Sequence, residues 1–205
     1  MPKKSSDIKL SILILSIPSR FSKLEKLISK LENQIKTEDV EILCLMDNKS
    51  FHIYEKRNEL LEMARGKYIC FLDDDDSVGD NYIESILEAT EDNLDLICFK
   101  QHCIYNGHHF DVYFDINHTW DPMDQLVFNG NRFNDLKRPP FHMCPFKSEI
   151  AKSEKFRENY DAAGQSCEDS DWLLRLYPKV QSQTIIDDAL HHYIYDSRET
   201  ESIVK

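Results

Sequence analysis

The first hundred residues of the chain alternate between two hydrophobic patterns. Short, nearly continuous apolar runs are typical of strands that are buried on both faces of a sheet. Between these runs, apolar residues recur at helical spacing and are separated by lysine and glutamate. The alternation predicts an α/β fold, with a mostly parallel central sheet and helices on both of its faces. The predicted strands lie at 8–17, 40–47, 67–72 and 94–100, and the predicted helices at 20–35, 54–66 and 79–89.

The second half of the chain has a different pattern, which predicts a small antiparallel part. Asn106 and Gly107 separate two strand-like runs and are typical of a hairpin turn. Residues 118–140 show weak periodicity and predict a long loop, a kind of segment that often has a functional role. No repeat or linker-like segment divides the chain, which favours a single domain over 1–205. The remaining elements are predicted as a strand within 142–151, a helix at 168–178 and one or two strands within 182–196.

Polar residues follow three of the predicted strands, at 16–20, 47–50 and 73–76. Ligands of such sheets bind beyond the carboxyl ends of the strands, so these segments are the first indication of a site. The third segment consists of four consecutive aspartates, Asp73 to Asp76, which we call the acidic run. At about 5 Å and an effective dielectric constant of about 20, each close pair of these charges costs roughly 3 kcal/mol.

A divalent cation would neutralise the repulsion within the acidic run, because hard cations take carboxylate oxygens as ligands. The alternative is a solvated turn in which Asp76 or Ser77 caps the next helix. Capping needs one acidic residue rather than four, so we favour a metal site. An EF-hand loop is excluded, because the glycine and the terminal glutamate that it requires are missing.

The composition narrows the class of protein. Hydrophobic residues make up 41% of the chain and charged residues 30%, which is enough for a packed core. The net charge of −12 argues against sequence-independent binding to nucleic acid and against binding to an anionic membrane surface. The six cysteines form no C-x-x-C pair, so a zinc site is not indicated. The N-terminal apolar run is too short to span a membrane and lacks a signal-peptide cleavage site, so we expect a cytoplasmic protein with reduced thiols.

The segment "ARGKYICFLDDDDSVGDNYIESIL" resembles the central part of family 2 glycosyltransferases. These are nucleotide-sugar-dependent enzymes of the GT-A fold, in which an A-x-G-x-Y-I-x-F-L-D-x-D-D pattern contains the metal-binding Asp-x-Asp. The upstream segments "LSILILSIPSRFSKL", "VEILCLMDNKS" and "EKRNELLEMARG" and the downstream "CEDSDWLLRL" are also similar to the family. The resemblance covers residues 8–100 and 141–178 and implies a single GT-A domain. In that domain 8–100 would be the nucleotide-binding half and 101–205 the acceptor-side half.

The resemblance also implies roles for individual residues. The residues implied to contact the nucleotide are Ser16, Pro18 and Arg20, Asp47 at the base (usually uracil), Arg57 and Asn58 beside the acidic run, and Asp73 at the ribose with Asp74 next to it. Asp75 and Asp76 are implied to hold Mn²⁺ or Mg²⁺ against the diphosphate, with His192 as a candidate third ligand. The chain departs from the family where Asp47 is followed by Asn48, since an acidic pair is common there.

The resemblance also implies that Asp169 and the adjacent Glu168 are catalytic, with Asp169 as the general base that accepts the proton of the acceptor hydroxyl. Taken alone, these two acidic residues are also typical of an ordinary helix N-terminus. Trp120 is a candidate for stacking on a sugar, whereas Trp172 occupies a helical core position. The other histidines show no ligand spacing: His102, His108, His109, His118 and His142.

These observations predict a metal-dependent glycosyltransferase that moves a sugar from a nucleotide-sugar, expected to be a UDP-sugar, to an acceptor hydroxyl with inversion. One alternative is a degenerate GT-A domain that binds a glycan or a partner without turnover. Another is a nucleotidyltransferase, but such an enzyme usually has a glycine-rich phosphate loop, and "SIPSRF" contains no glycine. The acceptor is a glycan, a protein or another hydroxyl compound, with nucleic acid disfavoured by the acidity of the chain.

Overall fold

The computed structural model describes residues 8–120, 135–162, 164 and 167–195. Its first half forms the parallel centre of a nine-stranded sheet, in which β1 pairs with β2 on one side and with β3 on the other. The elements of this half are β1 (Leu10–Ser16), η1 (Pro18–Arg20), α1 (Phe21–Glu32), β2 (Val40–Met46), α2 (Ile53–Met63), β3 (Tyr68–Asp73), β4 (Ser77–Val78), α3 (Tyr82–Ala89) and η2 (Thr90–Asp92). The predicted alternation of strand and helix is therefore confirmed.

The second half adds mostly antiparallel strands to this centre. The elements are β5 (Leu96–Tyr105), β6 (His108–Phe114), β7 (Leu136–Arg138), β8 (Phe146–Lys147), α5 (Ser148–Ala151), α6 (Glu168–Leu176), η4 (Tyr177–Lys179) and β9 (Gln183–Tyr195). The strand order is β2-β1-β3-β8-β5-β6-β7, and β9 pairs with both β4 and β5. Antiparallel β8 joins β3 to β5, so the two halves share one sheet.

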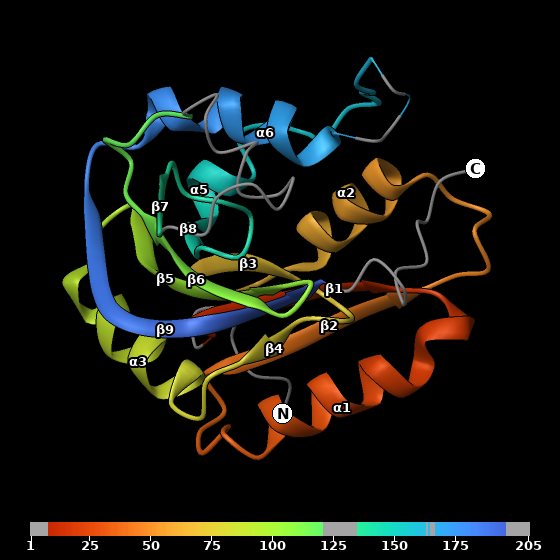
Figure 1. The fold of residues 1–205 in the computed structure, drawn as a ribbon, viewed down its shortest axis with the longest axis horizontal. Coiled ribbons are helices and arrows are strands. Elements are labelled where there is room, and N and C mark those ends of the chain that lie inside the picture. The colour runs from red at the N-terminus through yellow and green to blue at the C-terminus, as the bar shows by residue number, and fades with distance from the viewer. Residues whose placement is uncertain (1–7, 121–134, 163, 165–166, 196–205) are drawn as a thin grey trace.

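Helices cover both faces of the sheet, as predicted. Figure 1 shows α1 and α3 below the sheet and α2, α5 and α6 above it. The long strand β9 curls along the side of the molecule and reaches β4, which directly follows the acidic run. The C-terminal half thereby contacts the segment that the sequence marks as a site.

Aromatic side chains fix α6 against β3. Trp172 of α6 is fully buried and stacks on Phe156 with ring centroids 4.5 Å apart. The Trp172 ring also packs edge-to-face against Phe71 of β3 and Phe146 of β8, with ring centroids 6.1 and 5.9 Å apart. The predicted core position of Trp172 is confirmed, and its packing sets where α6 begins relative to the end of β3.

The prediction that the strand at 40–47 is buried on both faces is wrong. This strand is β2, which forms the edge of the sheet among the described residues, and most of its residues are only partly buried. Cys44, which lies in this apolar run, is consequently exposed. Apolar composition alone does not distinguish an edge strand from a central one.

Asn106 and Gly107 form the predicted hairpin turn between β5 and β6, with φ angles of 48° and 83°. The segment 182–196 holds one long strand, β9, whose pairing with β5 shifts register near Lys100. Most of the predicted loop at 118–140 falls in 121–134, outside the described residues. Among the described residues, no helix combines the length and the apolar character needed to cross a bilayer.

Candidate active site

The acidic run forms a tight turn at the carboxyl end of β3. The Asp76 N–H donates to the Asp73 carbonyl at 3.0 Å, and the Asp73 N–H donates to the Asp76 carboxylate at 2.8 Å. The exposed fractions of the four side chains alternate: 48% for Asp73, 3% for Asp74, 43% for Asp75 and 7% for Asp76. Only Asp73 and Asp75, in the Asp-x-Asp spacing, are therefore open to a ligand.

The two inward aspartates have partners within the protein. Asp74 accepts a hydrogen bond from the Ser16 hydroxyl at 2.7 Å and forms an ion pair with Arg20 at 2.7 Å. Asp76 lies 2.9 Å from Nε2 of His191, a buried residue of β9. Burial would raise the pKa of Asp76, but the nearby His191 outweighs it and lowers that pKa. These contacts connect the acidic run to β1 and β9.

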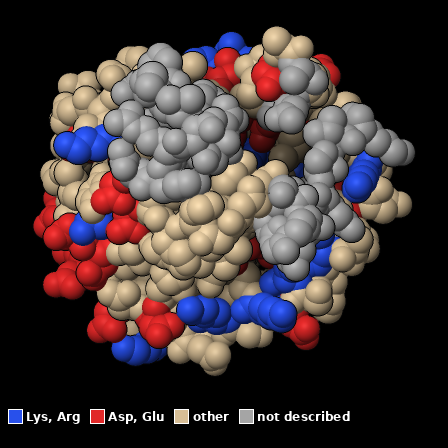
Figure 2. Space-filling model, viewed as in Figure 1, with Lys and Arg blue, Asp and Glu red and all other residues tan. Residues whose placement is uncertain are grey.

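Positive charge surrounds the exposed Asp75. Its carboxylate contacts the Arg20 guanidinium, and Lys23 Nζ lies 3.8 Å away. Arg20 belongs to η1, which begins with Pro18 directly after β1, and Lys23 belongs to α1. Along the lower edge of the molecule, where Figure 1 places α1, Figure 2 shows basic side chains with acidic ones between them. The structure therefore brings Ser16, Pro18 and Arg20 to the same sheet edge as the acidic run.

The start of α6 lies next to the acidic run, although the two are far apart in the sequence. Glu168 is buried and accepts a hydrogen bond from Arg57 Nε at 3.0 Å. The same guanidinium lies 3.8 Å from Asp73, so Arg57 of α2 contacts both predicted carboxylate groups. Asp169 lies beside them with 19% of its side chain exposed.

His142 lies between the two acidic segments. Its Nδ1 is 3.4 Å from Asp169 Oδ2, and its Nε2 is 3.9 Å from Asp73 Oδ2. Burial would raise the pKa of Asp169, but the nearby His142 and Arg57 outweigh it and lower that pKa to about 2. Asp169 is thus ionised at neutral pH. His142 was not predicted as a site residue, because its place depends on tertiary contacts and no residue spacing points to it.

Two predicted nucleotide contacts have internal partners. Asp47 is nearly buried, accepts hydrogen bonds from the Ser50 and Phe51 N–H groups at 2.6 and 2.9 Å, and pairs with Lys56 at 2.6 Å. Burial would raise the pKa of Asp47, but Lys56 and these N–H groups lower it to about 2. The Asp47 carboxylate therefore stabilises the loop that follows β2, a role that was not predicted from the sequence.

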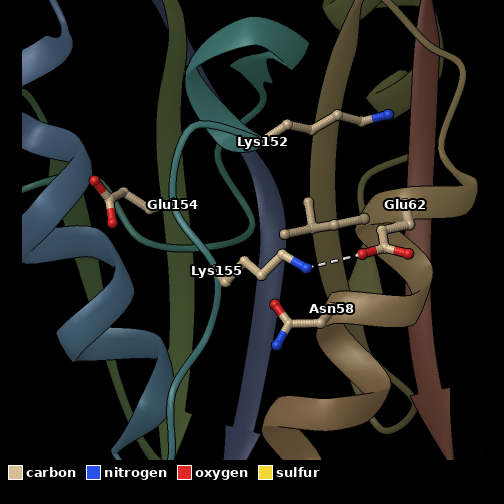
Figure 3. A pocket seen from close by; sticks show the side chains of 6 residues that line it. Asn58, Glu62, Lys152, Glu154 and Lys155 are labelled. Carbon is tan, nitrogen blue, oxygen red and sulfur yellow. Dashed lines mark hydrogen bonds and ion pairs between the residues drawn. The ribbon is translucent and has the colours of Figure 1, made fainter.

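Asn58 of α2 also serves the fold. Its amide donates to the Phe156 carbonyl at 2.9 Å and accepts from the Phe156 N–H at 2.9 Å. Figure 3 shows Asn58 in a pocket between α2 and the segment after α5, with Lys155 paired to Glu62. The residues that line this pocket are Asn58, Leu61, Glu62, Lys152, Glu154 and Lys155. None of them belongs to the acidic run or to the Glu168–Asp169 pair.

His192 points away from the acidic run. It follows His191 on β9, and successive side chains of a strand point to opposite faces. Its ring centroid lies 6.2 Å from that of His102 on β5. Throughout the described ranges, no three His, Cys, Asp or Glu side chains are arranged to hold a metal ion. Of the predicted ligands, Asp75 alone is exposed at the site.

Trp120 is partly exposed. Its ring meets Phe141 edge-on at 6.3 Å, and the Arg138 guanidinium lies 4.9 Å from its centroid. Phe141 also contacts the ring of His142, so a single phenylalanine ring separates Trp120 from His142. This position is compatible with the predicted acceptor side.

Comparison with known proteins supports the resemblance seen in the sequence. The chain is similar in structure to S. aureus TarS 1-349, with a TM-score of 0.63 and 12% identity over 91% of this chain and 60% of that one. Crystal structures of TarS 1-349 in complex with UDP-GlcNAc and with UDP match at TM-scores of 0.63 and 0.65 with 13% identity, covering 95% and 92% of this chain. The chain thus spans about three fifths of the TarS fragment that it matches. No curated protein matches it in sequence.

The structural likeness confirms the GT-A fold, a mixed α/β fold with a curled, mostly parallel sheet. A family model described as "Glycosyl transferase family 2" matches residues 51–153, which include α2, the acidic run and His142. This match covers half of the chain. The protein therefore belongs to glycosyl transferase family 2.

Proposed function

We propose that the protein transfers a sugar from a UDP-sugar to an acceptor hydroxyl, with Asp169 as the general base. The observation that carries this proposal is the meeting of Asp73 and Asp169 on the two sides of His142. It places the exposed part of the acidic run next to a partly exposed, ionised carboxylate. The similar TarS structures are complexes with UDP and UDP-GlcNAc, which supports a uridine nucleotide as the donor.

In the proposed reaction, the acceptor oxygen forms a bond to the anomeric carbon of the sugar. The bond between that carbon and the diphosphate oxygen breaks, and the diphosphate leaves with the electron pair. The hydroxyl proton goes to the carboxylate of Asp169. Attack on the face opposite the diphosphate inverts the anomeric centre.

A carboxylate with a pKa of about 2 is a weak base toward an ordinary alcohol. The acceptor oxygen becomes acidic as its bond to the anomeric carbon forms, however, so Asp169 needs to take the proton only late in the step. An ionised carboxylate is always ready to do so at neutral pH. The negative charge of Asp169 also stabilises the oxocarbenium-like transition state, because the carboxylate and the reacting sugar would lie in the same partly buried site.

The family implies a divalent cation, and the exposed Asp75 fits this role. Carboxylate oxygens are the preferred ligands of Mn²⁺ and Mg²⁺, and when bound such an ion would stabilise the charge of the leaving diphosphate. We assign Asp75 as its protein ligand and give Asp76 and His192 other roles, since Asp76 contacts His191 and His192 points away. Arg20 and Lys23 add positive charge where the diphosphate would lie.

Calorimetric titration with UDP, in the presence and absence of Mn²⁺, tests the donor site. We expect UDP to bind more tightly with Mn²⁺ and this gain to disappear in Asp75→Ala. Asp187→Ala is a matched control, because Asp187 is an exposed residue of β9 whose carboxylate pairs with Lys100. A wild-type protein that binds UDP neither with nor without Mn²⁺ would contradict the proposal. UDP binding without any sugar transfer would instead support a non-catalytic binding domain.

A further inference from the structure

His142 is held in place by its backbone and by burial. Its carbonyl accepts a hydrogen bond from the Phe71 N–H of β3 at 2.9 Å, and its side chain is only 5% exposed. The imidazole therefore lies at a fixed place beside the end of β3. A buried polar ring at such a place normally has hydrogen-bond partners for its nitrogens.

The imidazole faces a carboxylate on each side, but neither contact is a close hydrogen bond. Nδ1 lies 3.4 Å from Asp169, and Nε2 lies 3.9 Å from Asp73. In the part of the chain that the structure describes, Nδ1 has no hydrogen-bond partner of good geometry. A buried donor aimed at a catalytic carboxylate from just beyond bonding distance is suited to tighten when substrate enters.

Arg57 does not replace His142 in this role. Its guanidinium is bound to Glu168 at 3.0 Å and packs over the rings of Phe71 and Phe156, at 5.0 and 5.5 Å from their centroids. Arg57 thus fixes Glu168, whereas His142 is the side chain that faces Asp169. Arg57 and His142 thus each face a different one of the two adjacent acidic residues of α6.

We propose that His142 is a positioning residue for sugar transfer, which orients Asp169 toward the acceptor and connects it to Asp73 on the donor side. This inference rests on the proposed function, since it assigns Asp169 the proton of the acceptor. His142 touches the general base rather than the reacting atoms. It would also explain why a histidine, and not an aromatic hydrocarbon ring, occupies a buried place next to Phe141 and Phe71.

Three substitutions separate positioning from simple packing. Asparagine places its amide nitrogen near the position of Nδ1, glutamine places it near Nε2, and phenylalanine fills the space without a donor. We expect His142→Phe and His142→Gln to lower kcat by roughly 10- to 100-fold, as loss of a supporting partner commonly does. We expect His142→Asn to keep most of the wild-type kcat, because it restores the contact with Asp169.

UDP affinity and melting temperature should stay near the wild-type values in all three variants, which shows that they fold. A His142→Phe protein with the kcat and KM of the wild type would overturn the inference. A His142→Asn protein that folds normally but loses as much kcat as His142→Phe would overturn it as well.

Nitrogen-15 NMR of histidine-labelled protein tests the contact without relying on turnover. The His142 signals are identified by their loss in His142→Phe. We expect Asp169→Asn to move the Nδ1 resonance and Asp187→Asn to leave it in place. If the wild type neither binds UDP nor transfers sugar, the proposed function fails while this experiment still decides the contact. If Asp169→Asn moves neither nitrogen resonance, the role of His142 is wrong even in an active enzyme.

Discussion

The guanidinium of Arg57 donates a hydrogen bond to Glu168 at 3.0 Å, and both side chains are buried. Arg57 comes from α2 and Glu168 from the first turn of α6, so this pair joins the two halves of the domain. It holds the start of α6 beside the acidic run and thereby sets the position of Asp169. The neighbouring Asp73 lies 3.8 Å from the same guanidinium.

Removing one charge of this pair should strongly destabilise the protein. Glu168→Gln leaves the buried Arg57 without its full counter-charge, and breaking a buried pair typically costs about 3–5 kcal/mol. Urea unfolding measures the change. Glu62→Gln is the control, because Glu62 forms an ion pair of the same length, 3.0 Å, with Lys155 at the surface. We expect that control to cost less than about 1 kcal/mol, and equal losses in the two variants would show that the Arg57–Glu168 pair is not a structural anchor.

Asp169→Asn should remove the general base and leave the donor site intact. We expect kcat to fall about 10²- to 10⁴-fold, the usual contribution of a positioned base, with UDP affinity nearly unchanged. Asp171→Asn provides the control, since Asp171 lies in the same helical turn but pairs with Arg175 at 2.7 Å. Full transfer activity in Asp169→Asn would assign the base to another residue.

The stability of the protein should fall in acid as its low-pKa carboxylates become protonated. Asp47 and Asp169 each have a pKa lowered to about 2 in the folded protein. A lowered folded-state pKa stabilises the protein above the unfolded-state value, and this stabilisation is lost as the pH falls toward 2. The shift from the model-peptide value corresponds to roughly 2 kcal/mol for each group.

Urea unfolding at pH 6 and at pH 3 tests this dependence. Asp47→Asn should lose stability at pH 6 and show a smaller decrease between the two pH values than the wild type. An unchanged pH dependence in that variant would mean that the pair of Asp47 and Lys56 does not persist in solution.

Gly66 is required where β3 begins to pair with β1. A Cβ atom at this position would lie 2.5 Å from the Ser11 nitrogen and 2.6 Å from the Ser11 hydroxyl, so the backbone would have to move. We expect Gly66→Ala to cost about 1–3 kcal/mol, the usual range for overpacking. Gly79→Ala is a milder comparison, because its Cβ would come no closer than 3.3 Å to the Asn81 side chain. Thermal unfolding of both variants measures the difference, and equal melting temperatures would contradict the close approach.

The same glycine shows how far a local pattern can be interpreted. The helix predicted over 54–66 ends at Gly66, but α2 ends at Met63 and Gly66 has no left-handed conformation. The position of the glycine is determined by β1, which is distant in sequence. The buried strands β1 and β3 and the hairpin at Asn106 and Gly107 were predictable, because their signals lie within a few neighbouring residues.

The site was predictable only as far as its residues follow strand and helix ends. The acidic run and the Glu168–Asp169 pair follow from such positions, and the structure brings them together. The division of the run into exposed and buried aspartates depends on Ser16, Arg20 and His191, and no local pattern encodes these contacts. The place of His142 depends on the pairing of its backbone with Phe71, which is equally distant in sequence.

The rate of UDP release from a panel of UDP-sugars, with Mn²⁺ and with and without candidate acceptors, tests the central claim most directly. The wild type and Asp187→Ala should release UDP at similar rates. Asp75→Ala and Asp169→Asn should release UDP much more slowly, although both variants remain folded. Equal rates in all four proteins would contradict a transfer site built from the acidic run and the start of α6.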